Sequence, residues 1–182
     1  MNNSIKDIWL LTGYEIFAQQ GPNGLKVESI ARLVSKSKSS FYHHFGDLDL
    51  FKTELLNHHI KKSKLIAEKA KNCKKMVPDI IHLLVESKID IFFNRQLRIN
   101  RNIQAFKECS EKASGLVENA FLEVWSKDLG LGNEMQLGRI ILNLIVENFY
   151  LKVTEDSLDY EWIANYFNEI KSMVKAMTKT GK

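Results

Sequence analysis

The sequence has few of the residues that interrupt helices or cross-link small domains. Among its 182 residues there are two prolines, Pro22 and Pro78, and two cysteines, Cys73 and Cys109. Because the cysteines are far apart and belong to no Cys-x-x-Cys or Cys/His pattern, we expect free thiols and no metal site. The scarcity of proline, together with the lack of alternating apolar stretches, predicts an all-α protein.

Long apolar runs are missing as well. No segment approaches the roughly 20 apolar residues that a membrane span needs, and Met1–Asp7 is polar. The sequence therefore predicts no membrane span, no signal peptide and a cytoplasmic location. It also lacks a Gly-rich phosphate loop, a nucleophile elbow and an evident pair of catalytic carboxylates, so we expect neither enzymatic activity nor a cofactor.

Charge is only slightly unbalanced, but it is unevenly distributed. The formal net charge is +4, which permits a polyanionic partner without requiring one. The stretch Lys61–Lys75 holds seven lysines and one acid, Glu68. It leaves open an alternative function, a helical protein that binds polyanions or membrane surfaces through this basic stretch. Its few bulky apolar residues favour an ordinary solvated helix instead.

Apolar periodicity and turn residues predict about nine helices. Ser37 and Asp47 are suitable N-caps, Gly21-Pro22 ends the first helix, and Pro78 opens the fifth. Gly13 lies inside the first helix, which predicts that another helix approaches closely there. The predicted ranges are 4–20, 27–34, 37–45, 47–71, 78–93, 97–109, 112–129, 133–153 and 159–179.

The second and third predicted helices, joined by a turn at Ser35-Lys36, have the arrangement of a helix-turn-helix. We expect an apolar core that fixes the angle between them, made of Phe17, Ile30, Ala31, Leu33, Phe41 and Phe45. On the fourth helix we expect Leu50, Phe51, Leu55, His58 and Ile66 to share one face. The third helix then directs outward a polar face without acids, as reading of the major groove requires: Lys38, Ser39, Ser40, Tyr42 and His43.

These features resemble the DNA-binding domain of the TetR family of regulators over about Trp9 to Leu55. The residues that carry the resemblance are Phe17, Gly21, Ile30-Ala31, the run Ser37–Phe45, and Leu50-Phe51. The resemblance implies a three-helix DNA-binding domain over 1–46 and a helical ligand-binding and dimerisation domain over 47–182. It further implies a repressor that a small hydrophobic ligand releases from its operator.

The resemblance also implies roles for single residues. Ser39, Ser40 and His43 would approach base edges, and Ser37 would cap the recognition helix. The residues expected at phosphates are Lys26, Lys36, Lys38, Tyr42 and His44. Because neighbouring residues on a helix point about 100° apart, His43-His44 does not suggest a metal site.

The sequence departs from the family pattern at the turn and at the start of the fourth helix. Ser35 stands where glycine is usual, Lys36 stands where an apolar residue is usual, and Leu48-Asp49 replaces a common lysine. The phosphate contacts at these positions are therefore expected to be atypical.

For the remaining helices the resemblance implies a homodimer through the last two helices and a pocket for an unidentified effector. Apolar and polar residues of the fifth to eighth helices are candidates for that pocket: His82, Glu86, Phe92, Phe93, Phe106, Leu116, Phe121, Trp125, Asn143 and Glu147.

Overall fold

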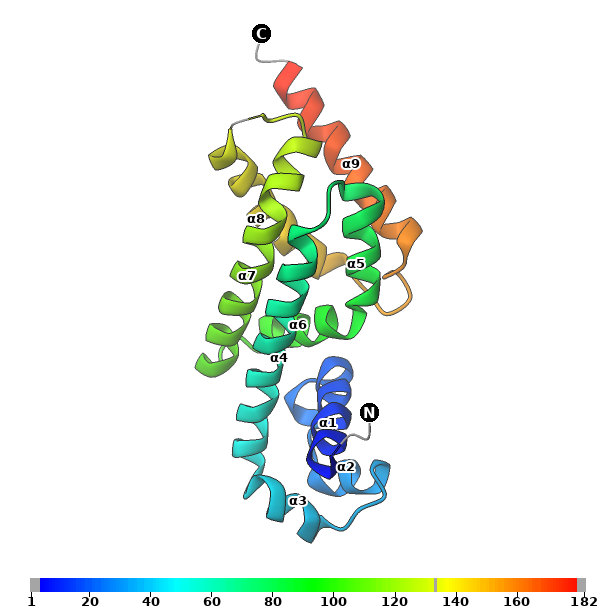
Figure 1. The fold of residues 1–182 in the computed structure, drawn as a ribbon, viewed down its shortest axis with the longest axis vertical. Helices are drawn as coiled ribbons and strands as arrows, with labels where there is room; N and C mark the ends of the chain where they lie inside the picture. The colour runs from blue at the N-terminus through cyan, green and yellow to red at the C-terminus, as the bar shows by residue number, and fades with distance from the viewer. Residues whose placement is uncertain (1–3, 133, 180–182) are drawn as a thin grey trace. The chain divides into compact units, whose positions relative to one another are not determined.

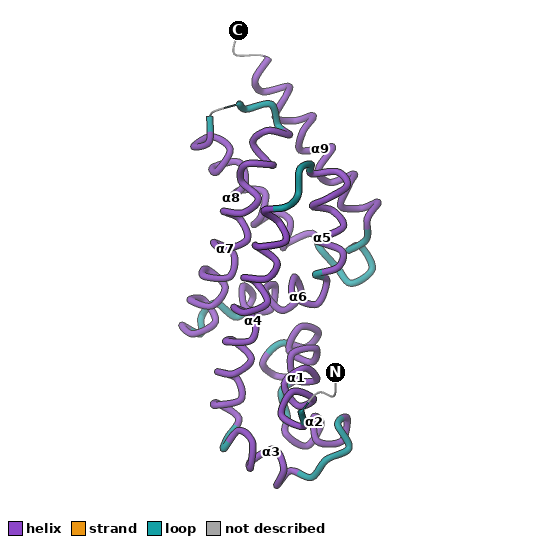
Figure 2. The backbone as a smooth tube through the Cα atoms, viewed as in Figure 1, coloured by secondary structure: helices purple, strands orange, loops and turns teal. Residues whose placement is uncertain are grey.

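The computed structural model describes residues 4–132 and 134–179. Within these ranges every regular element is a helix and no strand is present, which confirms the all-α prediction (Figure 1; Figure 2). The predicted start of the eighth helix at Asn133 lies outside the described residues.

The described residues form nine α-helices and two short helical turns. Their bounds are α1 Ile5–Gln20, η1 Pro22–Gly24, α2 Val27–Leu33, α3 Lys38–Phe45, α4 Leu48–Lys71, η2 Met76–Ile80, α5 Ile81–Glu86, α6 Lys88–Ile99, α7 Gln104–Asp128, α8 Met135–Lys152 and α9 Tyr160–Lys179. The chain divides into two compact units, Met1–Lys64 with Ile89–Ser114, and Leu65–Lys88 with Gly115–Lys182. The domain boundary between residues 46 and 47 stays a prediction.

Side-chain caps lie at the starts of α1 and α4, within one residue of the predicted starts. The hydroxyl of Ser4 accepts a hydrogen bond from the backbone N–H of Asp7, whose carboxylate accepts one from the backbone of Ser4. The carboxylate of Asp47 accepts one from the N–H of Leu50 at 2.7 Å, at the start of α4. Each of these bonds satisfies an N–H group that the helix itself leaves without a partner.

An aromatic cluster forms the core under α2 and α3. Trp9, Phe41 and Phe51 are fully buried, and the Phe41 ring centroid lies 5.3 Å from that of Trp9 and 5.1 Å from that of Phe51. Phe45 packs on Phe51 at 4.7 Å. These rings come from α1, α3 and α4, so burial of their apolar surface fixes the angle of α3 against its neighbours.

Two predicted core positions are wrong. Leu33 is 62% exposed, because the buried stripe of α2 contains Val27, Ile30 and Ala31 and leaves Leu33 outside it. Leu50 is 55% exposed. The buried positions of α4 follow a different register from the one predicted, with His59 in place of His58: Phe51, Leu55, His59, Ser63, Ala67 and Ala70.

The predicted close approach at Gly13 is confirmed. A Cβ atom on Gly13 would lie 2.7 Å from Cε1 of Phe51 and closer still to Cζ of the same ring. Glycine therefore allows α1 to lie directly against α4, which outweighs its cost inside a helix.

The predicted boundaries between residues 78 and 129 are wrong in detail. The predicted helix 78–93 is divided at Ser87, whose N–H donates to the carbonyl oxygens of Leu83 and Leu84, and α6 then continues to Ile99. The predicted break at 110–111 is absent, because Ser110 is buried within α7. Neither Ser87 nor the true break before Gln104 carries a proline or glycine signal.

In the second unit, α8 and α9 pack along apolar stripes. Ile163, Tyr166, Ile170 and Val174 are the buried residues of α9, and Leu142, Ile145 and Phe149 are those of α8. The Tyr166 hydroxyl donates to the Ile145 carbonyl oxygen at 3.0 Å. These contacts join the two helices within one chain.

Candidate nucleic-acid interface

The outer face of α3 is polar and open to solvent. Phe41 and Phe45, one turn apart, anchor the inner face, and the hydroxyl of Ser37 accepts from the N–H of Ser40 at 3.3 Å. Tyr42 is 51% exposed, although aromatic side chains are usually covered. The other exposed side chains of this face are Lys38, Ser39 and His43, while Ser40 and His44 are half-buried.

The turn before α3 has the unusual backbone that its sequence indicates. Ser35 has a φ of 53°, in the left-handed region where glycine is favoured. The N–H of Lys36 donates to the carbonyl oxygen of Ala31 at 3.0 Å, which closes the turn and leaves the Lys36 side chain exposed. Lys26 occupies the N-cap of α2 without a side-chain hydrogen bond and is exposed as well.

An ion pair that was not predicted from the sequence links α2 to the first residue of α3. The Lys38 ammonium lies 3.0 Å from Oε1 of Glu28. The hydrogen bond and the opposite charge raise the pKa of Lys38 and lower the pKa of Glu28. Ten residues separate the two, so no helical spacing within one element could reveal the contact.

The acids at the start of α4 also have partners inside the protein. Asp47 caps the helix, and Oδ1 of Asp49 lies 2.9 Å from the ammonium of Lys52. Both carboxylates therefore have local partners, and these partners reduce the repulsion that a phosphate near α3 would meet.

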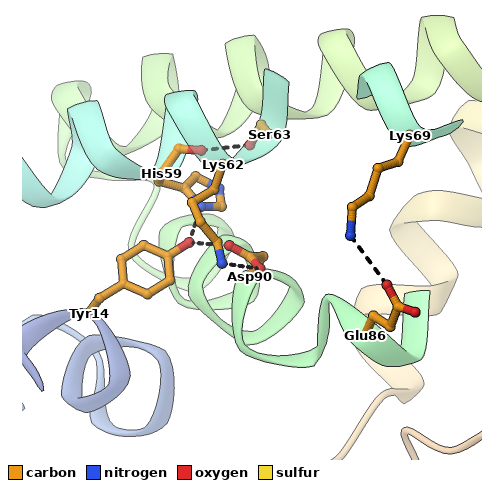
Figure 3. A network of polar contacts seen from close by, with 7 residues as sticks. All are labelled: Tyr14, His59, Lys62, Ser63, Lys69, Glu86 and Asp90. Carbon is orange, nitrogen blue, oxygen red and sulfur yellow. Dashed lines mark hydrogen bonds and ion pairs between the residues drawn. The ribbon is translucent and has the colours of Figure 1, made fainter. Parts of the chain in front are cut away.

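A buried polar network joins α1, α4 and α6 within the first unit (Figure 3). The hydroxyl of Tyr14 donates to Oδ1 of Asp90 at 2.8 Å and lies 2.6 Å from Nδ1 of His59. The second oxygen of Asp90 pairs with the Lys62 ammonium at 3.3 Å. This network is not among the sequence-based predictions, although an aspartate among the apolar residues of α6 is a signal that could have suggested a buried partner.

Burial dominates the electrostatics of His59. Removal of the ring from water disfavours its charged form and lowers its pKa to about 3. The imidazole is therefore neutral at physiological pH. Because the Tyr14 proton goes to Asp90, Nδ1–H of His59 donates to the phenolic oxygen.

The basic stretch Lys61–Lys75 forms the end of α4 and the turn after it. Three of its lysines are paired with acids: Lys62 with Asp90, Lys69 with Glu86 at 3.3 Å and Lys71 with Glu68 at 2.7 Å. Its apolar residues do not form one exposed face, because Leu65 is exposed whereas Ala67 and Ala70 are buried. A membrane-surface or general polyanion function is therefore not favoured.

The described part of the chain lacks membrane-spanning helices and clusters of metal-binding side chains. No helix there is both long enough and apolar enough to cross a membrane. No group of three or more His, Cys, Asp or Glu side chains is placed there to hold a metal ion. Cys73 and Cys109 are free thiols.

The residues predicted to line an effector pocket fall into both units. In the first unit Phe92, Phe93 and Phe106 are buried, and Phe93 stacks on Tyr14 with ring centroids 4.2 Å apart. In the second unit Phe121 and Trp125 are buried and Leu116 is half-buried, whereas the polar candidates His82, Glu86, Asn143 and Glu147 are exposed. The pocket stays a prediction.

Comparison with known proteins bears on this arrangement. A sequence model of the family described as "Bacterial regulatory proteins, tetR family" matches residues 10–57. No curated protein matches the chain. The crystal structure of a Rhodococcus sp. protein assigned to the TetR family of transcriptional regulators superimposes with a TM-score of 0.56 at 14% identity, over 96% of both chains, which shows a shared fold. The matched residues comprise α2, α3 and the buried rings of Phe41, Phe45 and Phe51, so this part of the chain is similar to the DNA-binding part of the tetR family.

Proposed function

We propose that this protein is a regulator of the TetR type that binds duplex operator DNA as a dimer, with α3 in the major groove, and represses transcription. The observation that carries the proposal is the outer face of α3, an exposed polar surface on a helix whose inner face is anchored by Phe41 and Phe45. The helix contains no acid. Such a surface suits hydrogen bonding to base edges and contact with phosphates.

The proposal assigns different roles to residues of this face. Ser39, Ser40 and His43 contact base edges. Phosphate contacts come from the remaining candidates, Lys26, Lys36, Lys38, Tyr42 and His44, with Ser37 fixing the start of the helix. The phosphate contacts supply affinity for any sequence, and the base contacts supply the preference for one.

The DNA-binding proposal is tested with duplexes selected from a random pool. We expect Tyr42→Ala with His43→Ala to lower the affinity for the selected duplex by about 10- to 100-fold, since each good contact is worth about 1–3 kcal/mol. The matched control is Lys61→Ala with Lys64→Ala, two exposed lysines of α4, which should bind as wild type does. Lys62 is kept intact because it pairs with the buried Asp90. The opposite pattern would point to general polyanion binding.

The dimer proposal is supported by apolar residues left exposed on the last two helices. On α8, Ile140, Leu144 and Leu151 recur on one face at helical spacing and are 56%, 69% and 81% exposed. On α9, Met173 and Met177 lie one turn apart and are exposed as well. Exposed apolar residues at this spacing suit contact with a second copy of the chain, and two copies would form a four-helix interface.

Release by a small hydrophobic ligand is the remaining part of the proposal. It is supported by the buried network that ties α1, next to the DNA-binding helices, to α4 and α6. A ligand that shifts α4 or α6 would alter the setting of α1, and coupling of this kind is reciprocal. A compound found by a thermal-shift screen of apolar and aromatic molecules should then bind more weakly in the presence of operator DNA. Equal affinities with and without DNA would contradict the coupling.

A further inference from the structure

Glu28 lies within reach of the recognition face and contacts its first cation. The Lys38 ammonium is 3.0 Å from the Glu28 carboxylate, and the two side chains are 55% and 69% exposed. Lys38 is the first residue of α3, and Glu28 lies in the first turn of α2. The pair therefore connects the two helices of the helix-turn-helix at their solvent side.

An exposed pair of this kind is open to exchange. Water and salt compete with it, so it holds the two side chains together only weakly. A DNA phosphate offers the ammonium the same chemistry as a carboxylate, an anionic oxygen that accepts a charge-assisted hydrogen bond. Because the carboxylate and the phosphate are both anionic, a phosphate that reaches Lys38 competes with Glu28 for the ammonium.

We propose that Glu28 sets the DNA affinity of this regulator by occupying the Lys38 ammonium in the free protein and releasing it to a phosphate in the complex. The inference rests on the proposed function, because it requires that the face of α3 meets DNA. It adds an affinity-determining residue that contacts no base and acts through Lys38.

Two consequences follow from the exchange. DNA binding breaks the existing ion pair between Glu28 and Lys38. The affinity for every duplex is therefore lower than it would be if Lys38 had no acidic partner. Discrimination between sequences is unaffected, because the contact is made to the backbone and not to a base.

The experiment is a double-mutant cycle of Glu28→Gln, Lys38→Gln and the double variant, each titrated against two duplexes of equal length. One duplex is selected from a random pool, and the other has an unrelated sequence. With Lys38 present, we expect Glu28→Gln to tighten binding to both duplexes by about three- to tenfold near 0.1 M salt. With Lys38→Gln, the same change should alter affinity by less than about twofold.

The control for net charge is Glu15→Gln, which removes another exposed acid of the first unit, on α1. It should change affinity by less than about twofold, because at ordinary salt a charge outside the contact is screened. Thermal midpoints of all variants are compared, since Glu28 also lies in the first turn of α2.

The outcomes separate this inference from the proposed function. Equal tightening by Glu28→Gln with and without Lys38 would show that Glu28 acts on DNA directly, and it would overturn the exchange. An unchanged affinity of Glu28→Gln in a protein that binds the selected duplex would overturn the role of Glu28 alone. A wild-type protein that binds neither duplex would overturn the proposed function, and this inference with it.

Discussion

At the scale of single residues, Tyr14 has a buried hydroxyl that contacts two polar side chains. Its hydroxyl lies between the Asp90 carboxylate and the His59 ring, away from water. We expect Tyr14→Phe to lower the free energy of unfolding by about 1–3 kcal/mol, because it leaves buried hydrogen-bonding groups without a partner. Urea unfolding followed by circular dichroism measures the change.

The matched control for Tyr14→Phe is the same substitution at an exposed tyrosine. Tyr42→Phe removes a hydroxyl that solvent already reaches, and it should change stability by less than about 0.5 kcal/mol. Equal effects at the two positions would mean that the buried network contributes nothing to stability.

His59 makes stability depend on pH through its low pKa. The folded protein keeps the ring neutral down to about pH 3, whereas the unfolded chain takes up a proton near its ordinary pKa of about 6.5. Between these values the unfolded state binds more protons, so the contribution is complete above pH 6.5 and is lost progressively as the pH falls. The expected loss from this residue at pH 5 is about 2 kcal/mol.

The pH prediction is checked by comparing wild type with His59→Gln across this range. The variant lacks the titrating ring, so the difference in unfolding free energy between the two proteins should shrink from pH 7 to pH 5. A difference that stays constant would contradict the assignment. The comparison cancels the contributions of the other titrating groups, including His58, whose pKa burial also lowers.

At the scale of helices, Gly13 tests the packing of α1 against α4, and Gly115 of α7 is its control. Gly13→Ala gains about 1 kcal/mol of helix propensity, but its Cβ would overlap the ring of Phe51, which is fully buried between Phe41 and Phe45. Overpacking of this kind costs about 1–3 kcal/mol, so we expect net destabilisation. Gly115→Ala in α7 meets nothing within 4 Å and should stabilise the protein by up to about 1 kcal/mol. Thermal denaturation of the two variants should show shifts of opposite sign.

The same scale shows why some helix boundaries are predictable from sequence and others are not. Ser37 and Asp47 mark helix starts because their side chains satisfy backbone N–H groups within three residues, a purely local effect. The breaks at Ser87 and before Gln104 carry no such signal. They follow from which face of α6 must be buried, and this depends on partners distant in sequence, such as Tyr14 for Asp90.

The candidate site also has features that the sequence predicts and features that it does not. The polar face of α3 is predictable from the sequence, because Phe41 and Phe45 lie one turn apart and determine which side points inward. The Glu28–Lys38 pair and the Tyr14 network cannot be predicted from the sequence pattern, because they join side chains from different helices. The exposure of Leu33 was missed because a terminal residue of a seven-residue helix lies at the edge of a short stripe.

At the scale of the whole molecule, DNA recognition and self-association are expected to depend on each other. A palindromic operator presents two half-sites about 34 Å apart, so a single chain can occupy only one of them. The dimer gains from the second site through a raised effective concentration, worth about 100- to 10,000-fold. The apolar face of α8 is therefore expected to affect DNA binding although it contacts no DNA.

Leu144→Glu tests this dependence, because it places a charge in the middle of the exposed apolar face of α8. We expect sedimentation velocity to show a monomer, and the affinity for a full palindromic duplex to fall by about 100-fold or more while that for a half-site duplex changes by less than about threefold. The control is Leu65→Glu on α4, where a leucine 65% exposed compares with 69% for Leu144, and it should stay dimeric and bind both duplexes as wild type does. A Leu144→Glu protein that remains a dimer would exclude this face of α8 from the interface. A monomeric variant with undiminished affinity for the palindrome would show that α3 reads its site without a partner copy.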